Sequence, residues 1–415
     1  MDNKGSRQIL SLIENIQRHS EGITISSDKK ESLNSFFKTG FPTTKDEEWK
    51  YTSLKRIVSE NYSVDCIGKN IVEEEIHKNS LGFSKKIIFS DGVLISTPSI
   101  NNVTISSYSE FKSNNVDSIS QLNYALAKNG YTITVADNSI INDPIEILFF
   151  NTVEGNFIQY RNVMTVGKNA QVKFIEKIQN INCHSSFVNH FTQINCGRNS
   201  NVEYNKIQNN TSKSRLIDSM NVLQKQDSVC NVNNLIFGGE FIRNNLNFEQ
   251  VGTNAESNMN GISILSDTQL ADNHTFVDHR SPNCRSNEMY KGVYLDKAKG
   301  VFNGKIMVRQ NSQKIDAFQA NNNLLLSEEA TINSKPQLEI YADDVKCSHG
   351  CTIGQLDKNA LFYMRSRGVG LQEAYAILTY AFASEAINNI TIDEVVFLAK
   401  NLLAKKLNVD IDLSQ

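Results

Sequence analysis

Gly167-Lys-Asn-Ala170 and Gly197-Arg-Asn-Ser200 are two short stretches of one kind, and they decide the fold of this 415-residue chain. Gly and Asn favour tight turns, because both tolerate the left-handed backbone conformation. Similar stretches recur at a spacing of roughly 30 residues, which indicates a repeat architecture. The others are Ala136-Asp-Asn-Ser139, Gln226-Asp-Ser228, Gly252-Thr-Asn-Ala255 and, later, Ser327-Glu-Glu-Ala330.

The segments between these turns alternate apolar and polar residues, as in Val172-Lys-Phe-Ile-Glu and Val202-Glu-Tyr-Asn-Lys-Ile. Such alternation predicts strands with one buried face. No long helical pattern separates the strands, which argues against an ordinary βαβ sheet. We therefore expect a mainly β protein with a parallel β-solenoid core, in which Asn residues at matching turns form hydrogen-bonded ladders. A β-sandwich with chance similarity between its turns is the alternative.

The segments on either side of the repeats have helical patterns. We expect an N-terminal helical and mixed domain over 1–130, a β-helix core over 131–345 and a C-terminal helical domain over 346–415. Apolar spacing predicts one helix near 119–127 and C-terminal helices near 371–387 and from 392 onward. The repeat period is expected to break between Ser257 and Asp296, giving a loop or an irregular rung there.

Composition limits the classes of function. The net charge of −3 and the pI near 6.2 give no electrostatic case for binding nucleic acid. No stretch approaches the roughly 18 apolar residues that a membrane span needs, and the first residues do not resemble a signal peptide. Seven scattered cysteines without regular spacing favour a reducing compartment over a disulfide framework. We expect a soluble, cytoplasmic protein.

Tyr341-Ala-Asp-Asp-Val-Lys-Cys-Ser-His-Gly-Cys351 gathers most of the reactive chemistry of the chain. Cys347, His349 and Cys351 are soft or borderline ligands that suit iron, zinc or sulfur species. The spacing is not that of a closed zinc site, so a tight turn with a buried Cys and a hydrogen-bonded His is the structural alternative.

Other candidate sites are weaker. Asp278-His279 could be an acid/base pair, but structural roles are the expectation for it and for His184, His190 and His274. Trp49 is expected to pack, with Glu47 and Glu48 solvated. Gly300-Val-Phe-Asn-Gly-Lys-Ile306 lacks the length and the Ser or Thr of a phosphate-binding loop, so ATP hydrolysis by this chain is not expected.

The run Lys335-Pro-Gln-Leu-Glu-Ile-Tyr-Ala-Asp-Asp-Val-Lys-Cys-Ser-His-Gly350, with Leu361-Phe-Tyr-Met-Arg-Ser-Arg-Gly368, resembles the signature of the SufB/SufD family, and of its SufD branch in particular. Glu48-Trp-Lys-Tyr-Thr52 near the N-terminus is also similar. The resemblance covers nearly the whole chain. It implies a right-handed parallel β-helix with helical domains at both ends. It also implies a non-catalytic role in iron–sulfur cluster assembly.

The resemblance further implies partners and ligands. A SufB-like subunit would form a heterodimer with this chain, and a SufC-like ABC ATPase would dock on its C-terminal helices. His349, with Cys347 beside it, would bind iron or a nascent cluster that is shared transiently with the SufB-like subunit. Cys351 departs from the family pattern, in which a small residue is more common. Two alternatives are a self-sufficient homodimeric scaffold and a β-helix carbohydrate-active enzyme.

Overall fold

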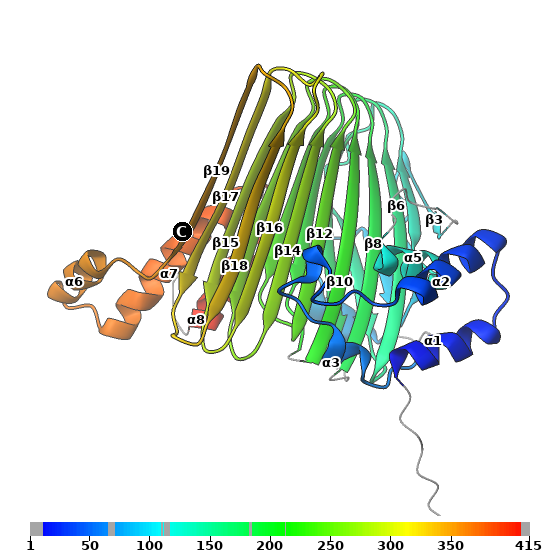
Figure 1. Ribbon diagram of the computed structural model, residues 1–415, viewed down its shortest axis with the longest axis horizontal. Helices are drawn as coiled ribbons and strands as arrows, with labels where there is room; N and C mark the ends of the chain where they lie inside the picture. The colour runs from blue at the N-terminus through cyan, green and yellow to red at the C-terminus, as the bar shows by residue number, and fades with distance from the viewer. Residues whose placement is uncertain are drawn as a thin grey trace, which may run out of the picture.

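The computed structural model describes residues 11–64, 71–108, 111, 117–181, 185–211 and 213–407, and it confirms the predicted parallel β-solenoid. Two long sheets wind together for about eight turns, with helices at both ends of the chain (Figure 1). Cys66, Cys183 and His184 lie outside the described residues.

Each turn of the solenoid adds one strand to each of two sheets. Sheet A has nine strands in the order β18-β16-β14-β12-β10-β8-β6-β4-β3, and sheet B has ten in the order β19-β17-β15-β13-β11-β9-β7-β5-β1-β2. Sheet A comprises β3 (Val103–Ser107), β4 (Tyr131–Val135), β6 (Asn156–Val166), β8 (Ser185–Cys196), β10 (Lys213–Gln224), β12 (Phe241–Gln250), β14 (Leu270–His279), β16 (Lys299–Val308) and β18 (Thr331–Ile340). Sheet B comprises β1 (Lys86–Ser90), β2 (Val93–Ser96), β5 (Ile145–Asn151), β7 (Gln171–Asn180), β9 (Asn201–Gln208), β11 (Val229–Ile236), β13 (Glu256–Leu265), β15 (Arg285–Tyr294), β17 (Ile315–Leu325) and β19 (Val345–Gly354).

Strand pairing rules out the sandwich alternative. Neighbouring strands from β4 to β18 in sheet A, and from β5 to β19 in sheet B, pair in parallel. Only the pairs β1–β2 and β3–β4, at the N-terminal end, are antiparallel among the described strands. Parallel pairing in register places equivalent residues of successive turns directly above one another. Side chains far apart in the sequence are thereby brought into contact.

The predicted Asn ladder is present at the turns that lead from sheet A to sheet B. Asn138, Asn169 and Asn199 all have positive φ angles, between 54° and 58°. The Asn169 side chain donates to Asn138 Oδ1 at 2.7 Å, and Asn199 donates to Asn169 Oδ1 at 3.0 Å. Asn tolerates this conformation better than most residues, so the same side chain both forms the turn and links it to the next.

The predicted break in the period between Ser257 and Asp296 was wrong. Strands β13, β14 and β15 continue the register without interruption. The turns in this region lack the Gly-x-Asn pattern, but Asp267 and Asn283 take positive φ angles of 53° and 61°. Because Asp and Asn share the ability to enter the left-handed region, the turn geometry persists although the sequence pattern does not.

Helices lie outside the solenoid at both ends of the chain (Figure 1). Near the N-terminus are α1 (Leu12–Glu21), α2 (Ser27–Thr39), the 3₁₀ helix η1 (Glu47–Trp49), α3 (Lys55–Val58), α4 (Glu73–Asn79) and α5 (Ser118–Leu126). Near the C-terminus are α6 (Lys358–Ser366), α7 (Leu371–Ile387) and α8 (Asp393–Leu407). Apolar residues of α1, α2 and α5 pack with Phe157, Phe187 and Phe241 of sheet A, whereas α7 and α8 pack on sheet B.

Among the helices in the described part of the chain, none combines the length and apolar character needed to cross a membrane.

Candidate metal centre

The last turn of the solenoid consists of β18 and β19, which are the outermost strands of sheets A and B (Figure 1). No further strand of the described chain pairs with either outer edge. The Cys-Ser-His-Gly motif lies on β19, so the alternative of a tight turn was wrong. The first helix after the motif begins at Lys358, and the proposed domain boundary at residue 346 stays a prediction.

Cys347, His349 and Cys351 lie on one face of β19, because side chains alternate along a strand. Their partners on β17 are Ala317, Gln319 and Asn321, which are all buried. The three motif residues therefore belong to the side of β19 that faces the interior of the solenoid. His349 and Cys351 are nevertheless exposed, since no further turn covers them.

Cys347 is the most enclosed of the three. Its side chain packs against an apolar cluster that includes Ile306, Ile315 and Ala317. Burial, and secondarily the negative charge of Asp316, raise the pKa of the Cys347 thiol. A metal has to displace that proton before Cys347 can bind as a thiolate.

The motif does not form a closed site by itself. Within the described ranges, only Glu176, His190 and Asp218 bring three ligand atoms within 4.8 Å of one another. His349 and its neighbouring thiols thus offer an incomplete ligand set at an open edge. An ion held there would need ligands beyond those that the described residues bring to this edge.

A buried polar column stands directly behind His349. Gln319 on β17 pairs with His349, and Glu288 on β15 pairs with Gln319. Gln319 Nε2 donates to Glu288 Oε2 at 3.1 Å, and Thr275 Oγ1 donates to the same oxygen at 2.6 Å. Burial raises the pKa of Glu288 to about 7. No sequence motif pointed to these residues; their only signal was a polar residue at an interior position of an alternating strand.

Glu176, His190 and Asp218 form a second cluster, in the middle of the solenoid interior. Lys206 Nζ lies 2.7 Å from Asp218 Oδ2, so a metal ion would meet a like charge there. His190 lies 3.2 Å from Asp218 and 3.6 Å from Glu176. Although burial opposes it, these carboxylates raise the pKa of His190. Lys206 therefore supplies a cation beside this cluster, and a structural role for His190 stays a prediction.

Asp278 and His279 do not act as a pair. Asp278 accepts hydrogen bonds from Arg280 at 2.6 Å and from Arg309 at 2.8 Å. His279 lies in the interior, where Ser286 Oγ is 3.0 Å away and burial lowers its pKa to about 4. Adjacent strand residues point to opposite faces, which explains the separation.

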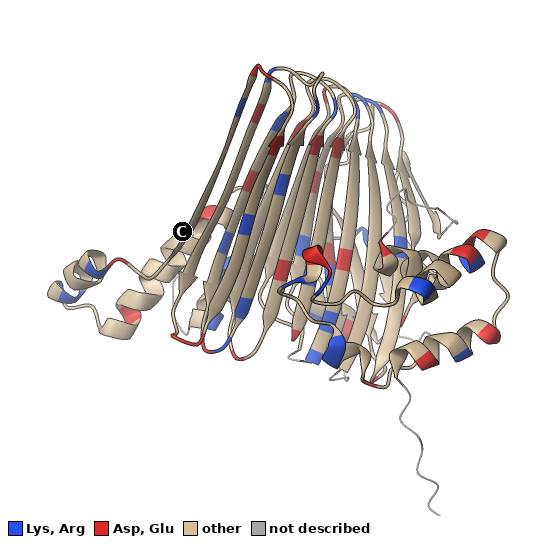
Figure 2. Cartoon of the chain, in the orientation of Figure 1, with Lys and Arg blue, Asp and Glu red and all other residues tan. Residues whose placement is uncertain are grey.

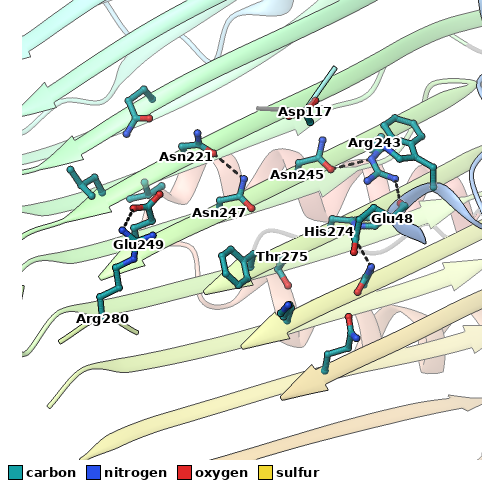
Figure 3. Close-up of a pocket in the computed structure, with 18 of the residues that line it drawn as sticks. Glu48, Asp117, Asn221, Arg243, Asn245, Asn247, Glu249, His274, Thr275 and Arg280 are labelled. Atoms are coloured by element: carbon teal, nitrogen blue, oxygen red, sulfur yellow. Dashed lines mark hydrogen bonds and ion pairs between the residues drawn. The ribbon is translucent and has the colours of Figure 1, made fainter. Parts of the chain in front are cut away.

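A groove of about 800 Å³ lies between sheet A and the N-terminal segment (Figure 3). At its end His274 lies 2.9 Å from Asp272 and 3.2 Å from Glu48. The Arg243 guanidinium lies 3.8 Å from the Trp49 ring centre, which confirms that Trp49 is a packing residue. Glu48 was predicted to be only solvated. Its contact with His274 instead links the N-terminal segment to the solenoid. Burial disfavours the charge on His274, but Asp272 outweighs it and the pKa of His274 is raised.

Positions of Lys and Arg and positions of Asp and Glu are interspersed along the strands of sheet A (Figure 2). Arg280 is 2.9 Å from Glu249, and Lys305 is 2.7 Å from Glu339. Paired charges of this kind do not make the continuous positive surface that nucleic acid requires.

Comparison with known proteins agrees with the sequence signature. The model of the "SUF system FeS cluster assembly, SufBD core domain" matches residues 149–382, and that of the "SufBD protein N-terminal region" matches residues 10–79. The iron–sulfur cluster assembly protein SufD of Escherichia coli is 30% identical over 379 residues, covering 88% of this chain and 89% of that protein. An iron–sulfur cluster assembly SufBD family protein of Synechocystis is 29% identical over 387 residues, covering 84% of each chain. The SufD protein of Bacillus subtilis is 23% identical over 293 residues, covering 70% of this chain and 67% of that protein.

The solenoid fold, the motif on its last strand and these matches lead to one assignment. The chain belongs to the SufBD family of iron–sulfur cluster assembly proteins and is SufD-like.

Proposed function

We propose that this chain is the SufD-like subunit of an assembly complex, and that iron–sulfur clusters are built at the open end of its solenoid, against a SufB-like subunit. The observation that carries the proposal is the placement of His349. It is exposed on an edge strand and faces the interior side of the last turn, beside an incomplete ligand set. Family membership favours this function over the carbohydrate-active alternative.

Iron, or a nascent cluster, is the cargo of this site. His349 binds it through a neutral imidazole nitrogen, Cys347 is an auxiliary thiolate ligand, and the SufB-like partner supplies the remaining ligands. Sharing the ligands between two subunits makes binding reversible, since separation of the subunits removes part of the coordination sphere. The chain itself contributes no catalytic step.

The edges of β18 and β19 are the proposed contact with the SufB-like subunit. An open strand edge presents unpaired backbone donors and acceptors to a strand of another chain. Apolar side chains near this end are unusually exposed: Tyr341 is 61% exposed and Ile353 is 49% exposed. Burial of these side chains adds an apolar contribution to the backbone pairing.

The C-terminal helices are the proposed dock for a SufC-like ATPase, which hydrolyses the ATP. Figure 1 shows α6 standing clear of the two sheets. On the helices Phe362 is 74% exposed, Tyr363 is 59% exposed and Phe397 is 56% exposed. Exposed aromatic side chains of this size are typical of protein interfaces.

The proposal is tested with His349→Ala in a complex reconstituted from this chain, a SufB-like subunit and a SufC-like ATPase. Copurification and circular dichroism should be unchanged, because His349 is exposed, whereas the cluster yield from iron and a sulfur donor should be lost. Cys347→Ser should reduce the yield by less. A normal yield with His349→Ala would refute the assignment of the ligand.

A homodimeric scaffold is the second candidate, because the same open edges fit a second copy of the chain. Anaerobic reconstitution of the isolated chain with iron and sulfide separates the two. A stable cluster on a dimer of this chain alone would favour the homodimer. Cluster formation only after addition of the SufB-like subunit would favour the heterodimer.

A further inference from the structure

Three residues from successive turns line up in sheet B at the open end of the solenoid. Glu288 pairs with Gln319, and Gln319 pairs with His349, so their side chains project from the same face one above the other. Glu288 and Gln319 are completely buried, whereas His349 ends the column and is exposed. Adjacent strands are about 4.8 Å apart, which puts the His349 ring within reach of the Gln319 amide.

A matching column in sheet A makes room for this arrangement. Thr275, Gly304 and Pro336 pair in register across β14, β16 and β18. Thr275 donates to Glu288 across the interior at 2.6 Å. A Cβ atom on Gly304 would lie 2.3 Å from Gln319 Nε2, so only glycine leaves space for that amide at this point.

The hydrogen bonds of the column have a fixed direction. The Gln319 Nε2 group donates a hydrogen bond to Glu288 Oε2 at 3.1 Å. Its carbonyl oxygen, Oε1, is buried and accepts no hydrogen bond from any described residue. A buried amide oxygen without a donor costs about 1–3 kcal/mol. The next interior side chain in the column is His349, whose ring carries an N–H group.

We propose that Gln319 is a positioning residue for His349: the exposed imidazole rotates toward the interior, and one ring nitrogen then donates a hydrogen bond to Gln319 Oε1, while Glu288 fixes the orientation of the amide. This inference rests on the proposed function, in which His349 is an iron ligand. The accepted N–H leaves the lone pair on the other ring nitrogen, directed toward the open end. Supports of this kind fix the tautomer of a ligating His and raise its basicity.

The first arm of the test uses the full chain without iron. Nitrogen-15 NMR of a histidine-labelled sample reports the tautomer of His349, assigned with His349→Ala. The wild type should hold one tautomer, and Gln319→Met, which keeps the length of the side chain but removes the acceptor, should give a mixture. Gln337→Met, on the outer face of β18, is the matched control and should leave the tautomer unchanged. A wild-type tautomer in Gln319→Met would overturn the hydrogen bond.

The second arm measures iron affinity and cluster formation in the reconstituted complex. Gln319→Met should weaken iron binding by roughly 10- to 100-fold, the usual effect of removing such a support. Glu288→Gln keeps an acceptor for Gln319 and should retain most of the affinity, whereas Glu288→Met should behave like Gln319→Met. A changed tautomer with unchanged affinity would overturn the positioning role.

The two arms separate this inference from the proposed function. If His349→Ala leaves cluster formation intact, the ligand assignment fails whatever the NMR result. If His349→Ala abolishes cluster formation and Gln319→Met does not weaken iron binding, only the positioning role fails.

Discussion

Glu288 is expected to make the stability of this chain fall as the pH rises through neutrality. Burial raises the pKa of its carboxyl group to about 7 from an ordinary value of 4.5. The folded protein therefore holds this proton more tightly than the unfolded chain. The resulting stabilisation is fully present below about pH 4.5 and is lost as the pH rises through about 7.

The structure sets the size of this effect. A difference of about 2.5 between the two pKa values corresponds to about 3 kcal/mol, at 1.36 kcal/mol per pKa unit. Glu288→Gln has no charge at any pH, so the variant should be spared this loss. Its free energy of unfolding relative to the wild type should rise by up to about 3 kcal/mol between pH 5 and pH 8.

Urea titrations followed by circular dichroism, at half-unit steps of pH, measure this difference. Glu328→Gln, at an exposed position in the turn after β17, is the matched control and should show no comparable trend. A difference between Glu288→Gln and wild type that stays constant with pH would refute the raised pKa. It would also show that the interior near the open end is accessible to water.

Three further predictions concern the interior and the N-terminal contact. Lys206→Met should lower the free energy of unfolding by about 3–5 kcal/mol in urea titrations, because it leaves the carboxylate of Asp218 buried without its cation. Because the pKa of His274 is raised, its contact with Glu48 is strongest below pH 6.5 and is lost as the pH rises through the pKa of His274 in the folded protein. Amide-exchange protection of η1 should therefore fall at high pH. Gly304→Ala should lower both the melting temperature and the iron affinity, because its methyl group would displace the Gln319 amide.

Each of these predictions has a matched control. Lys168→Met, at an exposed turn, should be nearly neutral, and an equal loss in both lysine variants would contradict the account of the buried cluster. Glu48→Gln should remove the pH dependence of protection, whereas Glu47→Gln should keep it; the same profile in both would exclude His274 as its source. Gly354→Ala meets open space and should be tolerated, and equal damage there would point to strand propensity instead.

The fold was predictable because each repeat is specified by a short segment of sequence, namely its turn residues and the alternating strand after them. Asn169 and Asn199 mark turns that any parallel solenoid needs, and the alternation after them gives the buried face. The turns at Asp267 and Asn283 were missed because the conformation depends on the residue at one position and tolerates changes around it. Local patterns therefore identified the architecture but not every turn.

Only part of the proposed site could be predicted from the sequence, for a physical reason. His349 stood out because Cys and His residues with spacing suited to ligands are rare and reactive. Gln319 and Glu288 lie 31 residues apart, and their relation exists only once the strands are in register. Tertiary structure, and not any motif, decides which residues face the interior near the open end. It also decides which of their polar atoms have hydrogen-bond partners.

The most direct test of the account is whether a nitrogen atom of His349 binds the assembled cluster. The complex would be reconstituted from this chain, labelled with nitrogen-15 histidine, and unlabelled SufB-like and SufC-like partners, and its reduced cluster examined by pulsed electron paramagnetic resonance. We predict a strongly coupled nitrogen-15 nucleus that disappears in His349→Ala. A cluster without nitrogen-15 coupling, or a coupling that survives in His349→Ala, would contradict the account.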